Sequence, residues 1–394
     1  MPRADSSDLS GTYSLDAVAG AKLAALEAKA LLRTPAETTR DGVHVTRGGR
    51  RLLSFACNDY LDLSRHPAVK QAAVDAIGKY GVGAGASRLV TGNHPLYAEL
   101  ESKLATLKGT EAACVFGSGY LANVGIISTL MGRNDAVFVD ELAHNCILSG
   151  AKMSGAAVHL FRHNDTAHLG ELLAAERAKH RHALIATDGV FSMDGDLAPL
   201  PALAALSDQF DAWLLADDAH GVGVVGGGRG SSFAFTPRPH VALQMGTLSK
   251  AVGGYGGYLC ASHTVVDLMK SRAGSLVYST GLPPAIVAAA IAALDIIATD
   301  PVTVAKPLAK ARAFTTALGL GDATSAIVPV VLGDSKAALA AAALLETEGF
   351  LVAAIRPPTV PQGTARLRFT FSASHDDADI NRLAAIVAER ILKS

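Results

Sequence analysis

The feature that most constrains the fold is a series of short apolar segments that alternate with helical stretches. The clearest are AACVF (112–116), VFVD (137–140), ALIAT (183–187) and WLLAD (213–217). Apolar strands separated by helices are typical of βαβ units and of a mostly parallel sheet. Because such sheets bind ligands beyond the carboxyl ends of their strands, polar residues at those ends are the first candidates for a functional site.

The pattern changes after a long helical run over 285–299, which Asp300-Pro301 ends. Strands are then predicted at 326–332 and 351–355, and a further strand, ARLRFTFSA, precedes a final helix. Near the other end, residues 14–33 have helical spacing of apolar residues. We therefore predict an α/β fold with three parts: an N-terminal helical arm (1–45), a large domain with a mostly parallel central sheet (46–300) and a small α+β domain (301–394).

Charge and hydrophobicity exclude several classes of protein. The 35 Lys and Arg residues balance 36 Asp and Glu residues, which argues against a nucleic-acid binder that depends on bulk positive charge. With 49% hydrophobic and 18% charged residues, the chain is not intrinsically disordered. Its longest apolar runs are shorter than the roughly 18 residues that span a bilayer, and its N-terminus lacks a signal-peptide core. We expect a cytoplasmic protein with no nucleic-acid or membrane partner.

The four cysteines do not suggest a metal or disulfide framework. They form no CxxC pair and lie among small or apolar residues, at positions 57, 114, 146 and 260. We expect reduced thiols without a function, and the spacing predicts no metal site.

Lys250 and Asp217 together suggest a cofactor. Each has an ordinary explanation alone: a solvent lysine in LSKAVGG, and a helix cap at a strand end. An aspartate at a strand end followed by a loop lysine, however, suits pyridoxal phosphate (PLP). The carboxylate would keep the pyridine nitrogen protonated, and the lysine would form the Schiff base. His220, three residues after Asp217, belongs to the same candidate group.

A phosphate group needs a cradle, and the segment Gly117 to Tyr120 is the candidate. It follows a predicted strand and opens a predicted helix, whose free N–H groups favour an anion. An ordinary tight turn explains the same residues. Thr247 and Ser249, close to the lysine, could add hydroxyl contacts.

Three further residues are candidates with equally plausible structural roles. His144 follows the strand at 137–140 and could stack on a cofactor ring, or serve as a structural hydrogen-bonding residue. Ser192 could bind a cofactor substituent or close a turn. Arg356 lies on a proline-rich loop that suits carboxylate recognition, or is a surface arginine.

These motifs resemble those of the α-oxoamine synthase family of PLP enzymes, in the aminotransferase-like (fold type I) superfamily. The resemblance runs from about Leu15 to Leu392. The stretches that carry it are FACNDYLDLSRHP, GAGASRLVTGNHPLYAELE, FGSGYLANVG, DGVFSMDGDLAPL, DDAHGVGVVGGGRG, TLSKAVGGYGGYL and IRPPTVPQGTARLRFT.

The resemblance implies a role for each candidate residue. Lys250 is implied as the Schiff-base lysine, Asp217 as the partner of the pyridine nitrogen and His144 as the group stacked on the ring. The other implied cofactor contacts are with O3′ for His220, with the phosphate for Gly119 and Tyr120, and with other atoms for Ser192 and Thr247. The implied substrate contacts are with the acyl substrate for Arg33 and with the amino acid or product for Arg356 and Thr359.

The loop IRPPTVPQGT implies the branch of the family that condenses L-alanine with pimeloyl-CoA or pimeloyl-carrier protein, with loss of carbon dioxide. The resemblance also implies a homodimer. The nearest alternatives are sister acyltransferases that use glycine with acetyl-CoA, glycine with succinyl-CoA, or serine with palmitoyl-CoA. A plain aminotransferase and a non-enzymatic sensor are more distant alternatives.

Overall fold

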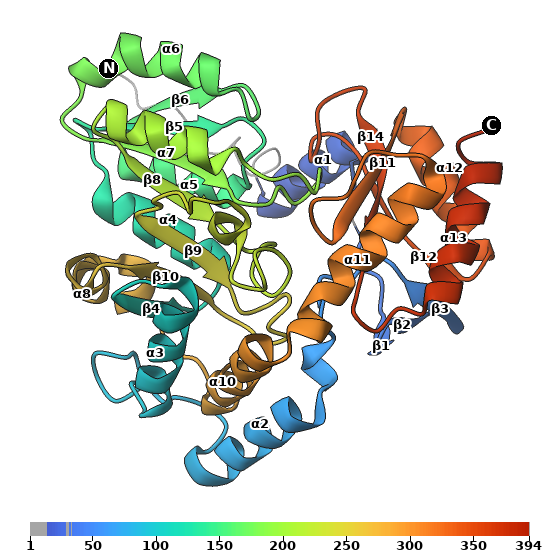
Figure 1. Cartoon of the computed structure of the whole chain (residues 1–394), viewed down its shortest axis with the longest axis horizontal. Helices are drawn as coiled ribbons and strands as arrows, with labels where there is room; N and C mark the ends of the chain where they lie inside the picture. Colours follow the sequence, from blue (N-terminus) through green and yellow to red (C-terminus); the bar gives the residue numbers. More distant parts are fainter. Residues whose placement is uncertain (1–13, 29–30, 33, 394) are drawn as a thin grey trace, which may run out of the picture.

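The computed structural model describes residues 14–28, 31–32 and 34–393. Its centre is a seven-stranded sheet (Figure 1), in which all strands are parallel except the antiparallel β10. This confirms the predicted α/β fold with a mostly parallel sheet. The strand order is β4 (Ala112–Phe116), β10 (Gly257–Ala261), β9 (Leu243–Thr247), β8 (Trp213–Asp217), β7 (Ala183–Asp188), β5 (Ala136–Asp140) and β6 (Ala157–Phe161).

Helices cover both faces of this sheet because its strands are apolar on both sides. In β5, for example, Val137 and Val139 face one core, and Ala136 and Phe138 face another. The first face packs against α4 (Gly119–Leu130), α5 (Asn145–Ser154), α8 (His263–Arg272) and the short α9 (Gly274–Val277). The opposite face packs against α6 (Thr166–Glu176) and α7 (Leu200–Gln209) at one end, and against α2 (Pro67–Tyr80), α3 (Leu96–Lys108) and α10 (Pro284–Thr299) at the other.

The C-terminal segment forms a separate core beside the main sheet (Figure 1). Strands β11 (Ile327–Gly333), β14 (Ala365–Thr370) and β13 (Ala353–Ile355) make an antiparallel sheet in that order. Helices α11 (Pro301–Leu318), α12 (Ser335–Thr347) and α13 (Asp377–Arg390) pack with it. The small C-terminal α+β unit is therefore present as predicted.

Residues near the N-terminus contribute to that same core. Strands β1 (Thr39–Asp41), β2 (His44–Arg47) and β3 (Arg50–Ser54) form a sheet with β12 (Phe350–Leu351), and Leu53 and Phe55 pack among C-terminal residues. The domain limits at residues 45 and 300 stay predictions. The pairing of β3 with β12 nevertheless places residues 50–55, which we assigned to the large domain, with the C-terminal unit.

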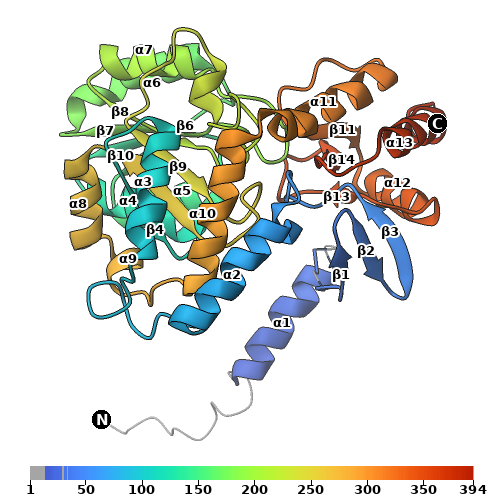
Figure 2. The same ribbon diagram turned by 60° about the horizontal axis from the view of Figure 1, so that its bottom comes forward.

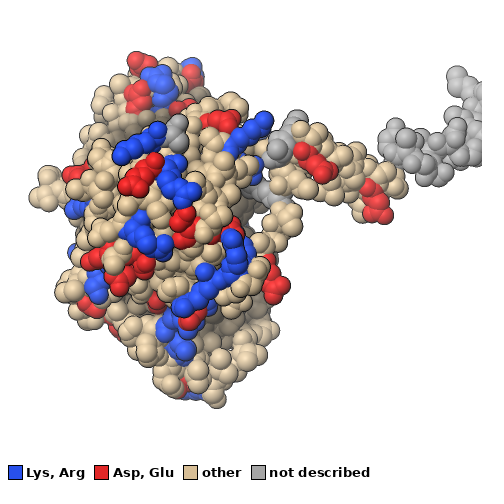
Figure 3. All heavy atoms as spheres, turned by 90° about the vertical axis from the view of Figure 1, so that its right-hand side faces the viewer, with Lys and Arg blue, Asp and Glu red and all other residues tan. Residues whose placement is uncertain are grey.

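Helix α1 (Leu15–Ala28) stands away from the rest of the chain (Figure 2). None of its residues is buried, and Leu15 is 83% exposed. Among the described residues, no single helix is long and apolar enough to cross a membrane; only α10 and α11 together pass that test of length and composition, with a bend of 81° between them. On the face seen in Figure 3, basic and acidic side chains are intermingled.

The short connecting elements are 3-10 turns: η1 (Leu63–Arg65), η2 (Arg177–Lys179) and η3 (Ser231–Ala234).

Candidate active site

A cavity of about 210 Å³ lies at the carboxyl ends of β5, β7, β8 and β9. The parallel strands bring together residues that are far apart in the sequence. All eight residues predicted to contact a cofactor line it: Gly119, Tyr120, His144, Ser192, Asp217, His220, Thr247 and Lys250.

Lys250 lies at one end of a hydrogen-bonded chain whose middle member is His220. Its Nζ is 2.7 Å from Nε2 of His220, and Nδ1 of His220 is 2.6 Å from the hydroxyl of Tyr60. Burial lowers the pKa of Lys250 to about 8 and raises that of Tyr60 to about 12. Burial, together with the positive charge of Lys250, holds the pKa of His220 well below its ordinary value. The imidazole is therefore neutral beside the lysine, and about a tenth of Lys250 is unprotonated at pH 7, far more than of an ordinary lysine.

Asp217 ends β8 and presents its carboxylate to the cavity. One oxygen accepts a hydrogen bond from Nδ2 of Asn123 (2.7 Å), and the other accepts from the backbone N–H of Ala219 (2.9 Å). Both donors are neutral, so they orient the carboxylate without cancelling its charge. This arrangement suits a ligand that brings a positively charged N–H group.

The N-terminus of α4 forms the anion-binding part of the cavity. Ser118 caps the helix by accepting a hydrogen bond from the backbone N–H of Leu121 (3.2 Å), and Gly119 and Tyr120 provide the first turn. A Cβ atom on Gly119 would lie 3.2 Å from Cε of Met245 and 3.4 Å from Cβ of Thr247. The absence of a side chain there leaves space for a phosphate close to the backbone.

These three features fit PLP. A lysine, a carboxylate and an anion-binding helix terminus converge on one cavity. In addition, Oδ1 of Asn123, beside Asp217, is buried without a hydrogen-bond partner among the described residues. The residues present therefore match both charged ends of the cofactor.

His144 is the N-cap residue of α5 and faces the cavity. Its Nδ1 lies 2.8 Å from Sγ of Cys146, and its backbone N–H donates to Asp188 (3.0 Å). Desolvation lowers the pKa of His144, so the ring is neutral and suited to stacking on an aromatic ligand. His144 therefore has a structural role as a helix cap and also lines the cavity, and its stacking on a cofactor ring stays a prediction.

Ser192 lies on the loop after β7, and this loop contacts strand β14 of the C-terminal unit. Nε of Arg368, on β14, donates to the carbonyl of Ser192, and both terminal guanidinium nitrogens of Arg368 lie 3.3 Å from Oδ1 of Asn58. Arg366 forms an ion pair with Asp194. The position of Ser192 in the cavity thus depends on contacts with the C-terminal unit.

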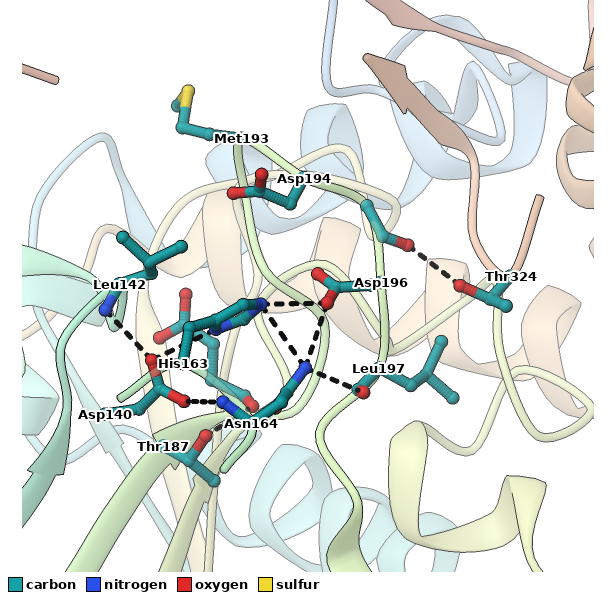
Figure 4. Close-up of polar contacts among 12 residues, drawn as sticks. Asp140, Leu142, His163, Asn164, Thr187, Met193, Asp194, Asp196, Leu197 and Thr324 are labelled. Atoms are coloured by element: carbon teal, nitrogen blue, oxygen red, sulfur yellow. Dashed lines mark hydrogen bonds and ion pairs between the residues drawn. The ribbon is translucent and has the colours of Figure 1, made fainter. Parts of the chain in front are cut away.

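The same loop is held from the other side by His163 (Figure 4). The imidazole donates to Asp140 from Nδ1 (3.1 Å) and to Asp196 from Nε2 (2.9 Å). Hydrogen bonds to these two carboxylates raise the pKa of His163 to about 10 against the opposing effect of burial. A charged His163 therefore links the end of β5, just before His144, to the loop that carries Ser192.

The other predicted site residues lie elsewhere. Arg356 and Thr359 are on the loop after β13 and do not line the cavity. Arg33 lies outside the described residues. Their predicted roles toward substrate stay predictions.

Sequence reasoning missed five residues that shape this site: Tyr60, Asn123, Cys146, Asp188 and Arg368. Four of them belong to motifs that carried the family resemblance, in FACNDYLDLSRHP, FGSGYLANVG, DGVFSMDGDLAPL and IRPPTVPQGTARLRFT. Asp188 also follows the predicted strand at 183–187 directly, so its position alone could have marked it. Of the cysteines, Cys114, Cys146 and Cys260 are buried and Cys57 is partly buried, and all four are free.

Comparisons with known proteins agree with this geometry. The family Aminotransferase class I and II matches residues 50–387. The chain is 63% identical to 8-amino-7-oxononanoate synthase of Beijerinckia indica over 376 residues, which cover 95% of this chain and 97% of that protein. It is 64% identical to the synthase of Methylocella silvestris over 347 residues, covering 88% and 99%.

Solved structures share the fold. Serine palmitoyltransferase from S. paucimobilis, with bound PLP and myriocin, has a TM-score of 0.87 at 29% identity, covering 94% of this chain and 96% of that one. The 8-amino-7-oxononanoate synthase of Francisella tularensis has a TM-score of 0.74 at 26% identity, covering 87% and 98%.

Proposed function

Because the chain belongs to the aminotransferase class I and II family, as a PLP-dependent acyltransferase of the α-oxoamine synthase type, we propose that it condenses L-alanine with a pimeloyl thioester to give 8-amino-7-oxononanoate for biotin biosynthesis. The observation that carries this proposal is the identity of more than 60% with 8-amino-7-oxononanoate synthases along nearly the whole chain.

The residues of the cavity would hold the cofactor at both ends. Lys250 would bind its aldehyde carbon, Asp217 would hold its ring nitrogen, and His220 would contact its phenolic oxygen. Gly119 and Tyr120, with Thr247, would hold its phosphate, while His144 would stack on the ring and Ser192 would support it. When bound, PLP supplies an electron sink for the negative charge that develops at Cα of the amino acid.

Lys250 is also the base in this proposal. Its Nζ would accept the proton from Cα of the amino acid, since a pKa of about 8 leaves about a tenth of the free amine unprotonated at pH 7. The neutral His220, 2.7 Å away, keeps the amine oriented without adding a competing charge.

Overall, Cα of alanine forms a bond to the carbonyl carbon of the thioester, the thiol leaves, and the carboxyl group departs as carbon dioxide. The substrate carboxylate needs a cation before that step. We assign this contact to Arg356, with Thr359, and place the acyl chain near Arg33. Arg368 is a second candidate cation, because it donates a hydrogen bond to the carbonyl of Ser192, which lines the cavity.

The protein works as a homodimer in the cytoplasm in this proposal. The support for a dimer is helix α1, whose side chains Leu15, Leu23 and Leu26 are exposed instead of packed against their own chain. Exposed apolar residues of this kind are typical of a surface that another subunit covers. The acyl carrier is either CoA or a carrier protein.

The test is turnover with defined substrate pairs. Purified protein is supplied with alanine, glycine or serine, and with pimeloyl, acetyl, succinyl or palmitoyl thioesters on CoA, and the pimeloyl group also on carrier protein. Released thiol and product mass are followed. We expect fastest turnover with alanine and a pimeloyl thioester. Faster turnover of glycine or serine with another acyl group would overturn the substrate assignment and leave the PLP enzyme assignment intact.

A further inference from the structure

A second group of ligand-type side chains lies outside the catalytic cavity, where α6 packs beside the edge strand β6 (Figure 1). His159 is on β6, Glu176 is the last residue of α6, and His180 directly follows η2. One ring nitrogen of each histidine and one carboxylate oxygen of Glu176 all lie within 4.8 Å of one another. The 3-10 turn η2 separates Glu176 from His180, whose backbone is extended, and the ligand atoms of the two residues lie close together after this turn.

The ring of His159 is held in a fixed orientation. It stacks on Phe138 of the neighbouring strand β5, with ring centres 5.0 Å apart and planes inclined by 19°. Its Nε2 is buried and has no hydrogen-bond partner among the residues that the structure describes. A buried polar atom without a partner costs free energy and calls for an explanation. Burial also lowers the pKa of His159, so the ring is neutral at pH 7 and offers a lone pair.

We propose that His159, Glu176 and His180 bind one zinc ion. Two imidazole nitrogens and one carboxylate oxygen are an established ligand set for Zn²⁺, with water in the fourth position. Bonds of about 2.0–2.2 Å to a tetrahedral zinc ion place its ligands roughly 3.4 Å apart, so ligand atoms that lie within 4.8 Å of one another must move closer together. Glu176 and His180 are partly exposed at the surface and can make that approach.

One charged group competes with the ion. Nζ of Lys179 lies 3.0 Å from both carboxylate oxygens of Glu176. This pair is at the surface, where such ion pairs contribute little to stability, so zinc can displace the ammonium. Lys179 therefore weakens zinc binding without preventing it.

The ion would have a structural role. Strand β6 is the outermost strand of the sheet, whereas the catalytic cavity lies at the ends of β5, β7, β8 and β9. A bound ion would join α6 and η2 to this edge strand. The spacing of the cysteines did not predict a metal site, and the three ligands proposed here come from a strand, from the last residue of the following helix and from the residue after η2.

The experiment uses the PLP-loaded protein after removal of metals, titrated with ZnCl₂ and followed by calorimetry and elemental analysis. We expect one ion per chain and a rise in Tm on addition of zinc, since a ligand that binds only the folded state stabilises it. His159→Gln, Glu176→Gln and His180→Gln should each weaken binding at least about tenfold. Lys179→Gln should strengthen it.

His182→Gln is the matched control, because His182 is a nearby histidine that stacks on Trp213 and is not part of the group. Its zinc binding should equal that of the wild type. The proposal is overturned if the wild type binds no zinc, or if Glu176→Gln and His180→Gln both keep wild-type affinity. These two variants alter partly exposed side chains, so the test does not depend on the folding of His159→Gln.

Discussion

Two lysines lie near the adjacent aspartates at the end of β8, and their roles differ. Lys108 forms an ion pair with Asp218, whereas Lys250 shares a cavity with Asp217. Lys108 is fully buried; its Nζ donates to Asp218 (2.6 Å) and to the carbonyl of Arg229 (2.7 Å). Asp218 also accepts a hydrogen bond from the backbone N–H of Ser231 (2.8 Å). Every charge in this group is neutralised within the protein.

Lys250, by contrast, has a neutral partner in His220, and Asp217 is bound by neutral donors. The two charges share a cavity without forming an ion pair with each other. A lysine and a carboxylate that lie in a partly buried cavity without an oppositely charged partner are typical of a ligand-binding site. The comparison therefore separates an ion pair that stabilises the fold from charges that act on a substrate.

The largest expected effect is that of Lys250→Ala on turnover. Loss of the covalent attachment and of the base should reduce kcat by at least about 10³-fold, since proton transfer by a positioned group alone contributes 10²–10⁴-fold. Thermal unfolding should change little. Turnover is measured with alanine and a pimeloyl thioester.

Borohydride reduction of the wild type followed by peptide mapping supplies the matched test. The cofactor should be fixed on the peptide that contains Lys250. Cofactor on a peptide containing Lys108, or on any other lysine, would contradict the distinction drawn between the two residues.

Lys108→Met tests the other half of the comparison. The substitution leaves Asp218 buried without its cation, which should lower the free energy of unfolding by about 3–5 kcal/mol. Urea unfolding measures the change. In the fraction that remains folded, turnover should stay near that of the wild type.

The double variant Lys108→Met/Asp218→Asn is the control. It removes the unpaired charge, so part of the lost stability should return. If Lys108→Met unfolded at the same urea concentration as the wild type, the ion pair would not stabilise the fold as inferred.

Asp217→Asn should preserve the hydrogen-bonding shape of the cavity but remove its negative charge. We expect kcat to fall by about 10²–10³-fold, the range found when one electrostatic contact to a reacting group is lost, while the protein still binds PLP. Absorbance of the bound cofactor and turnover are measured together. A variant with near wild-type kcat would show that the carboxylate does not support the electron sink.

The sequence predicted the roles of Lys250 and Asp217, but it did not predict the buried ion pair of Lys108 and Asp218. Lys250, Asp217 and the Gly117–Tyr120 segment follow strands, and parallel strands carry such residues to a common edge. Nothing local to Lys108 distinguishes it from a surface lysine at the end of an amphipathic helix. Its burial depends on Asp218 and Arg229, which lie more than 100 residues away along the chain.

Other features depend on tertiary contacts in the same way. The pairing of β3 with β12 joins residues from opposite ends of the chain, so no boundary in the sequence marks it. The hydrogen bond of Tyr60 to His220 joins residues that are 160 positions apart in the sequence. The loop that holds Ser192 depends on arginines of β14.

His163 extends the comparison to a histidine that is charged, whereas His220 is neutral. The pKa of His163 is raised from its ordinary value of 6.5 to about 10 in the folded protein. Its contribution to stability is therefore complete below about pH 6.5 and is lost as the pH rises through 10. His163→Gln should remove this part of the pH dependence.

The measurement is the free energy of unfolding of wild type and variant between pH 6 and about 10.5. Taking the difference between the two proteins cancels the titration of other groups, including that of Lys250. The stability gap should narrow as the pH rises. A gap that is constant with pH would mean that His163 is not held as a cation between Asp140 and Asp196.

The smallest expected effect distinguishes the two arginines available to the substrate carboxylate. An arginine can bind a carboxylate with two parallel hydrogen bonds, a geometry that lysine cannot reproduce. If Arg356 makes this contact, Arg356→Lys should raise the KM for alanine up to about tenfold, the equivalent of roughly 1.4 kcal/mol, and leave PLP binding unchanged. Arg368→Lys is the comparison variant, and it should also lower Tm because Arg368 binds Ser192 and Asn58.

The alanine-induced change in cofactor absorbance, titrated for both variants, separates substrate binding from later steps. An unchanged alanine affinity in Arg356→Lys, together with a weakened one in Arg368→Lys, would move the carboxylate contact from the loop after β13 to strand β14, where Arg368 binds the carbonyl of the cavity residue Ser192.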